Sequence, residues 1–189
     1  MMTKIKREKI AVFDLDDTLY QGNSHFLCLN EFYRTNIFTS IPARCLGKIL
    51  PGIHLKLANY FYNKIPYEYK CIFKLPYRNE VVKLFKSKQQ AGYQVVIVSN
   101  APVELLKNAA DDLQVECLKA RIGEKLACLQ KKFSFQELFV CTDNKTDLDL
   151  LNIADEAVIT CKPDKRRYFI ERVKCKNYKF IEDVCDNEV

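Results

Sequence analysis

Short apolar runs recur along this chain, and segments with helical spacing of apolar residues separate them. The runs typical of strands cover residues 10–13, 94–98, 115–118, 138–141, 157–160 and 178–181. The helical patterns cover residues 78–92, a segment opening near Pro102, and residues 124–130, 147–152 and 165–174. Alternating strands and helices favour an α/β fold, a Rossmann-like doubly wound parallel sheet with helices on both faces.

Residues 22–76 interrupt this alternation. They are rich in aromatic residues, show helix-like apolar spacing from Phe26 to Phe61, and contain Pro42 and Pro51. We therefore expect a small helical cap inserted after the first strand, with residues 1–21 and 77–189 forming the catalytic core.

The role of this insertion has three readings. As a lid over the carboxyl edge of the sheet, it would exclude water and select the substrate. It could instead be a packing extension with no part in recognition. The stretch 41–62, apolar with Arg44, Lys48 and Lys56, could also lie against a membrane, although we favour a packed cap.

Composition indicates an ordinary globular protein of 189 residues, 48% of them hydrophobic. No apolar stretch approaches the roughly 20 residues that cross a bilayer, and the first residues lack the apolar middle of a signal peptide. We therefore expect a cytoplasmic protein. The nine cysteines include no Cys-x-x-Cys pair, which favours reduced thiols over a zinc site.

The net charge of +6 is spread along the chain. No nucleic-acid module is recognisable, so we expect no nucleic-acid partner. A solvated basic surface is the favoured explanation of this charge. The alternative is that the charge attracts a phosphorylated or membrane-bound substrate.

Polar residues of a particular kind follow the predicted strands. Asp14, Asp16 and Thr18 follow the first strand, and Ser99 with Asn100 ends the second. The carboxyl edge of a parallel sheet is where open α/β proteins bind ligands. Taken alone, the acids could form a solvated turn, and Ser99 could cap the next helix.

Lys125, Asp143 and Asp147 follow further along the chain. Asp143 comes after a predicted strand, and Asp147 lies one helical turn later. Alone, the lysine could be one more exposed helix residue, and the two acids could lie at a helix N-terminus, where the dipole favours them. The whole set, in this order, is difficult to ascribe to chance.

With these motifs the chain resembles the haloacid dehalogenase superfamily of phosphotransferases, closest to its phosphoserine phosphatase-like branch, which has a helical cap after the first motif. Asp14-x-Asp16-x-Thr18 fits the first motif, and Ser99 and Lys125 fit the second and third. Asp143 and Asp147 fit the acidic fourth motif, where Thr142 replaces the usual Gly. The resemblance covers nearly the whole chain outside the insertion.

The resemblance implies a Mg²⁺-dependent phosphatase acting on a phosphorylated small molecule. Asp14 would be the nucleophile, and Asp16 would be the general acid and base. Mg²⁺ would be held by Asp14, the backbone carbonyl of Asp16 and Asp143, with Asp147 in support. Lys125 would neutralise charge on the nucleophile and the phosphoryl group. Thr18, Ser99, Asn100 and Lys125 would bind the phosphate.

Two other functions stay open at this stage. Asp16 argues against dehalogenase and phosphonatase chemistry, which needs no acid at that position, but a phosphomutase would carry the same residues. A non-catalytic binding or scaffold protein could retain the fold, and Thr142 is the main support for that alternative. The intact set of acids, Ser99 and Lys125 favours hydrolysis.

Overall fold

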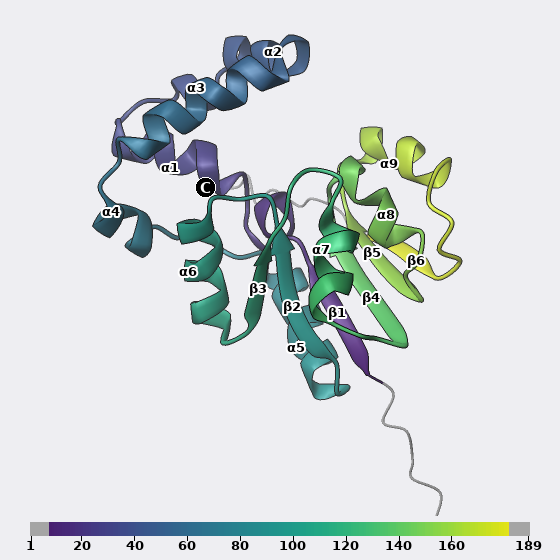
Figure 1. Ribbon diagram of the computed structural model, residues 1–189. Helices are drawn as coiled ribbons and strands as arrows, with labels where there is room; N and C mark the ends of the chain where they lie inside the picture. Colours follow the sequence, from purple (N-terminus) through teal and green to yellow (C-terminus); the bar gives the residue numbers. More distant parts are fainter. Residues whose placement is uncertain (1–7, 182–189) are drawn as a thin grey trace, which may run out of the picture.

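The sheet of the computed structural model, which describes residues 8–181, contains six parallel strands. Their order across the sheet is β3-β2-β1-β4-β5-β6 (Figure 1). The bounds are β1 Lys9–Phe13, β2 Gln94–Ser99, β3 Glu116–Lys119, β4 Glu137–Thr142, β5 Glu156–Thr160 and β6 Tyr178–Ile181. The predicted α/β fold with a doubly wound parallel sheet is confirmed.

Helices connect the strands. From the last helix before β2 onward, they are α5 Asn79–Gln90, α6 Val103–Leu113, α7 Lys125–Lys132, α8 Leu148–Leu151 and α9 Pro163–Ile170, with the short 3-10 turn η3 Lys145–Asp147 before α8. The last helix begins earlier and ends earlier than the predicted 165–174. Pro163 lies in its first turn, where its fixed φ suits a helix start. The helix ends at Ile170, before the predicted limit. Beyond it, Val173 and the buried Cys175 pack against the core as the chain returns to β6.

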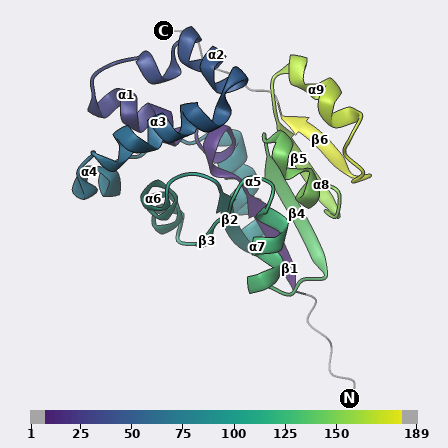
Figure 2. The same ribbon diagram turned by 45° about the horizontal axis from the view of Figure 1, so that its top comes forward.

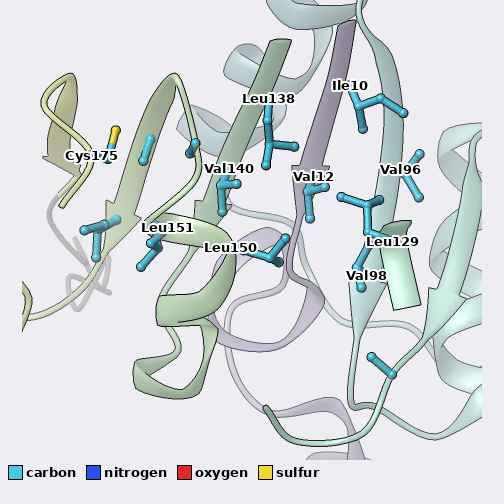
Figure 3. Packing of buried hydrophobic residues seen from close by; sticks show 14 of the residues in the cluster. Ile10, Val12, Val96, Val98, Leu129, Leu138, Val140, Leu150, Leu151 and Cys175 are labelled. Carbon is cyan, nitrogen blue, oxygen red and sulfur yellow. The ribbon is translucent and has the colours of Figure 1, made fainter. Parts of the chain in front are cut away.

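The sheet buries a separate apolar cluster on each face, because alternate strand residues point to opposite sides. On one face, Ile10, Val12 and the neighbouring strand residues pack against α7, α8 and α9, as Figure 3 shows for part of the cluster. On the other face, Phe13 packs against Phe85 of α5, with ring centroids 5.1 Å apart. Burial on both faces explains why the strands are continuous apolar runs.

The chain reverses its direction of winding between β1 and β4. From β1 it winds through β2 to β3, and it then returns to β4 beside β1 and continues outward to β6. The carboxyl ends of β1 and β4 therefore border the topological switch point, where ligands bind in open α/β sheets.

Four helices lie between β1 and α5: α1 Ser24–Phe32, α2 Ile41–Ile49, α3 Pro51–Asn63 and α4 Tyr67–Ile72, with the turns η1 Leu15–Leu19 and η2 Ile37–Thr39. Figures 1 and 2 show them beyond the end of the sheet near which α6 begins. We call α1 to α4 the helical segment. The proposed domain limits of 22–76 for the cap remain a prediction.

The helical segment has a small core of its own, which includes Leu29, Ala58 and Tyr62. Leu105 of α6 belongs to the same cluster. The side chain of Asn108, also on α6, donates to the carbonyls of Lys70 and Phe73 at 2.7 and 3.1 Å. The α4 end of the segment is therefore anchored to the sheet domain.

The eight cysteines within the described residues are free thiols, in line with the expected reduced state. Within residues 8–181, no helix combines the length and the apolar character needed to span a membrane.

Candidate active site

Asp14 directly follows β1, and the backbone fixes the position of its carboxylate. Its N–H donates to the carbonyl of Cys141 on β4 at 2.9 Å, which extends the sheet by one hydrogen bond. Its Oδ1 accepts from the N–H of Leu15 at 2.8 Å. This leaves Oδ2 to face Lys125 at the start of α7 and Thr142 at the end of β4.

The turn after Asp14 brings Asp16 to the start of α1. Asp17 has a φ of 54°, and its N–H donates to the carbonyl of Gly22 at 3.1 Å, so the chain bends back on itself. Asp16 Oδ1 accepts from the N–H of Ser24 at 2.8 Å. Burial raises the pKa of Asp16 to about 7, and the nearby Asp14 adds to the effect.

Lys125 is the buried cation of the site, with a side chain only 1% exposed. Its Nζ lies 2.7 Å from Asp14 Oδ2 and 2.7 Å from Asp147 Oδ2. Burial by itself would lower the pKa of this lysine, but the charges of Asp14 and Asp147 outweigh it and raise the pKa. The lysine therefore stays charged and holds two carboxylates together.

Thr142, which replaces the usual glycine of the fourth motif, takes part in this network. Its hydroxyl donates to Asp147 Oδ2 at 2.6 Å and accepts from the N–H of Asn144 at 3.0 Å. The hydroxyl also lies 3.5 Å from Asp14 Oδ2. The substitution adds hydrogen bonds among the acids and leaves them assembled.

Asp147 is 1% exposed and pairs with Lys125 and Thr142. Its burial, more than the neighbouring charge of Asp14, raises its pKa. The structure thus places Asp147 behind Asp14, where it orients the lysine, and its side chain does not line the pocket described below.

Asp143 and Thr18 bind each other across the switch point. The Asp143 N–H donates to Thr18 Oγ1 at 3.0 Å, and the Thr18 hydroxyl donates to Asp143 Oδ1 at 3.3 Å. Thr18 is fully buried and does not line the pocket described below, so the structure places it against Asp143, and its predicted contact with a phosphate stays a prediction. Burial, together with the charge of Asp14, raises the pKa of Asp143 well above its usual range.

A pocket of about 720 Å³ lies between the sheet edge and the helical segment, in front of these acids. Its polar lining includes Asp14, Asp16, Ser99, Asn100 and Asp143. The Nδ2 of Asn100 donates to the carbonyl of Ala120 at 3.0 Å, and Ser99 Oγ accepts from the N–H of Ala101 at 3.2 Å. Five of the eight predicted site residues therefore line one pocket, while Lys125, Asp147 and Thr18 support them from behind.

The sequence analysis missed several residues of this pocket. Lys119, at the end of β3, donates to the carbonyl of Ala101 at 2.8 Å and lines the pocket. Its position at the carboxyl end of a strand was a usable signal. Beside the cap aromatic Phe26, the helical segment contributes His25 and Leu55, which no strand-end pattern could have indicated.

A model of the haloacid dehalogenase-like hydrolases matches residues 11–152, so the chain belongs to this family. The span includes every site residue discussed above. The family expected from the sequence motifs is confirmed, and with it the expectation of a hydrolase. A search of curated proteins finds no significant match.

Solved structures of phosphoserine phosphatase share the fold. A substrate-bound complex is 17% identical with a TM-score of 0.67, covering 92% of this chain and 93% of that chain. A phospho-aspartyl intermediate analogue is 17% identical with a TM-score of 0.66, covering 86% and 91%. A phosphoserine phosphohydrolase-like protein from Francisella tularensis subsp. tularensis SCHU S4 is 19% identical with a TM-score of 0.58, covering 90% and 94%. The fold expected from the resemblance to the phosphoserine phosphatase-like branch is thus the observed fold.

The buried imidazole of His25 should make stability depend on pH. Burial, and then the charge of Lys119, lowers its pKa from 6.5 to about 4. Between these values the unfolded chain binds the proton and the folded chain does not, so stability falls as pH drops through this range. The loss at pH 5 should be about 2 kcal/mol. Urea unfolding near pH 7.5 and pH 5 should show a smaller decrease for His25→Gln than for the parent, and equal decreases would contradict the assignment.

Proposed function

We propose that the protein is a phosphatase that hydrolyses a phosphate monoester through an aspartyl phosphate on Asp14. The observation that carries the proposal is the buried Lys125, whose Nζ lies 2.7 Å from Asp14 Oδ2 beside the pocket. A phosphate monoester repels a carboxylate unless positive charge lies between them. Lys125 supplies such a charge at Asp14, a carboxylate that directly follows the central strand β1 and lines the pocket.

Asp14 would attack phosphorus while its other contacts hold it in place. The hydrogen bonds from Leu15 N–H and to Cys141 fix the carboxylate before the substrate arrives, so little ordering is needed at the moment of attack. Asp14 would then carry the phosphoryl group as the ester oxygen leaves.

Asp16 would donate a proton to the leaving oxygen and later accept one from the attacking water. Its pKa of about 7 suits both tasks near neutral pH, because protonated and ionised forms are then both populated. The hydrogen bond from Ser24 holds Oδ1, and the side chain lines the pocket beside Asp14.

The second strand would supply the phosphate-binding groups. Ser99 and Asn100 line the pocket at the end of β2, next to Asp14 at the end of β1. Lys119 lies beyond them on β3 and adds a cation on that side. These groups would bind phosphoryl oxygens whose charge grows in the transition state.

The acids fit a hard divalent cation such as Mg²⁺. Asp14 and Asp143 both line the pocket, and the charge of the first helps to raise the pKa of the second. A cation bound by both would relieve that repulsion, and the carbonyl of Asp16 would add a third oxygen. Within residues 8–181, no group of three or more His, Cys, Asp or Glu side chains is placed to hold a metal ion, and the proposed set accordingly combines two carboxylates with the backbone oxygen. Bound Mg²⁺ would stabilise charge on the phosphoryl oxygens.

The helical segment would act as the cap that selects the substrate. His25, Phe26 and Leu55 face the same pocket as Asp14, where they would meet the leaving group. A cytoplasmic location and a phosphorylated small-molecule substrate complete the proposal. A phosphomutase or a non-catalytic binding protein would retain the same residues, and turnover of an aryl phosphate separates hydrolysis from binding alone.

Substitution Asp14→Asn should abolish turnover of an aryl phosphate and leave the circular dichroism spectrum unchanged. The amide lacks the charge needed to attack phosphorus, while its oxygen can still accept from Leu15. In the parent protein, beryllium fluoride should form its adduct on Asp14, detected by fluorine NMR as a bound signal that Asp14→Asn eliminates. An adduct on any other residue would rule out the nucleophile, and a parent that binds substrate without turnover would indicate a binding protein.

Removal of divalent cations should silence the enzyme. The side-chain ligands are carboxylates, which favour Mg²⁺ over softer metals. Exhaustive treatment with a chelator should eliminate aryl phosphate hydrolysis, and added Mg²⁺ should restore it. Full activity after chelation would contradict the proposed ligand set.

Replacement of Lys125 by Met should slow phosphoryl transfer by roughly two orders of magnitude or more, the usual loss for one transition-state contact. The matched control is Lys131→Met in the same helix, because Lys131 is exposed. Single-turnover kinetics would compare the two variants after thermal melts have shown that both are folded. A larger loss in the Lys131 variant would reassign the catalytic lysine.

A further inference from the structure

Helix α2 is apolar without being buried. It contains no buried residue, and Ile41 and Ile49 are 76% and 74% exposed. Leu50, between α2 and α3, is 46% exposed. Surface aliphatic residues occur singly in most proteins, but a cluster of them marks an interaction surface.

Helix α3 adds an uncovered stripe. Ile53, Leu57 and Tyr60 are spaced by four and three residues, so they share one face of the helix. They are 56%, 46% and 56% exposed, whereas Ala58 and Tyr62 are buried in the core of the helical segment. Both faces of α3 are therefore apolar, and only one of them packs inside the protein. We call residues 41–63 the α2–α3 hairpin.

The charge of this region has a single sign. Between Glu31 and Glu68 the sequence has no Asp or Glu, although the whole chain contains 24. The same stretch carries five basic residues, Arg34, Arg44, Lys48, Lys56 and Lys64, all exposed. Exposed aliphatic residues with basic residues among them are typical of helices that lie on an anionic membrane.

Cavities connect this surface with the candidate active site. An apolar cavity of about 540 Å³ is lined by Leu46 and Leu57 of the hairpin, and by Phe38 and His54. The latter two residues also line a neighbouring pocket of about 490 Å³, which reaches Asp143. Arg44 lines this second pocket too, together with Lys162 and Lys165. An apolar chain and an anionic headgroup would thus find matching surroundings side by side.

We propose that the α2–α3 hairpin docks on an anionic lipid bilayer, and that the phosphate monoester cleaved by the site is carried by a membrane lipid. The substrate assignment rests on the proposed phosphatase function, whereas the docking surface does not. The hairpin would lie in the headgroup layer, because helices of nine and 13 residues are too short to cross the bilayer. Its basic residues would contact lipid phosphates, and Ile49, Leu50 and Ile53 would enter the acyl boundary.

A bilayer fits this surface better than another protein does. A second copy would place the same five positive charges opposite one another with no local acid to pair them, which opposes self-association. The charge complements an anionic leaflet such as that of the cytoplasmic membrane face. The adjoining apolar cavity suits an acyl chain, which an acidic protein partner would not supply.

Vesicle sedimentation tests the docking without any need for catalysis. Vesicles of phosphatidylcholine with about 30 mol% phosphatidylglycerol should bind the protein, pure phosphatidylcholine should bind it at least tenfold more weakly, and salt should weaken binding further. The double variant Ile49→Glu/Ile53→Glu should reduce binding at least tenfold. Its matched control is Ile153→Glu/Ile170→Glu, which changes two other exposed isoleucines, 44% and 59% exposed, outside the hairpin. Parent protein that fails to bind, or equal losses in both double variants, would overturn the docking.

Two substrates separate docking from chemistry. The hairpin variant should hydrolyse a soluble aryl phosphate at the parent rate but should hydrolyse phosphatidic acid in anionic vesicles at least tenfold more slowly. Parent protein that binds vesicles and cleaves the aryl phosphate but not the vesicle-borne monoester would overturn the lipid substrate. Inactivity on both substrates despite vesicle binding would instead refute the phosphatase function and leave the docking intact. A stable dimer that the hairpin variant abolishes, without vesicle binding, would assign the surface to a second copy.

Discussion

The arrangement of the site depends on one buried ion pair network, in which Lys125 holds Asp14 and Asp147 together. Burying three charges is costly unless each finds a partner, and here two carboxylates share one ammonium. Lys125 does not neutralise all the carboxylates of the site. Asp14 and Asp143 line the pocket, so negative charge faces it. Burial, and then the charge of Asp14, raises the pKa of Asp143, so a bound cation would stabilise the ionised form of this carboxyl. Stability and chemistry are therefore coupled at the same few atoms.

The topology of the sheet decides which side chains can join this network. Parallel pairing of β1 with β4 brings Asp14 beside Thr142, although 128 residues separate them in the sequence. Thr18 then reaches Asp143 from the turn after β1, which connects the two motifs by hydrogen bonds in both directions. The central strands bring the acids to one edge of the sheet. The register between these strands also determines which carboxylate oxygen accepts from which donor.

Much of this could be predicted from the sequence, since strand ends and motif order are local patterns. Asp14, Asp16 and Asp143 were placed at the sheet edge because a buried strand precedes each motif. What could not be predicted depends on long-range contacts. The hydrogen bonds between Thr18 and Asp143 follow from the register of two strands, so they could not be predicted from the local motif. Thr142 appeared to weaken the fourth motif, and only the geometry reveals its hydrogen bond to Asp147.

In the helical segment too, the sequence could not predict what depends on long-range contacts. Its apolar spacing predicted helices, but the spacing of α3 is compatible with two opposite faces, and the sequence does not say which face is covered. Packing of Ala58 and Tyr62 against α1 and α6 resolves this for one face and leaves Ile53, Leu57 and Tyr60 outside. Likewise, His25 could not be identified as a pocket residue until α1 was positioned by the hydrogen bond between Asp16 and Ser24.

The attachment of the helical segment at its α4 end has a consequence for how this protein can change over evolutionary time. Asn108 and Leu105 of α6 hold the base of the segment, while α2 buries nothing. Substitutions at the exposed positions of α2 therefore alter no contact of the buried core, and their energetic effects should be nearly independent of those at Asp14 or Lys125. The exposed face of α2 is free to diverge toward new surfaces at little cost in folding, whereas the base of the segment and the sheet edge must be inherited together.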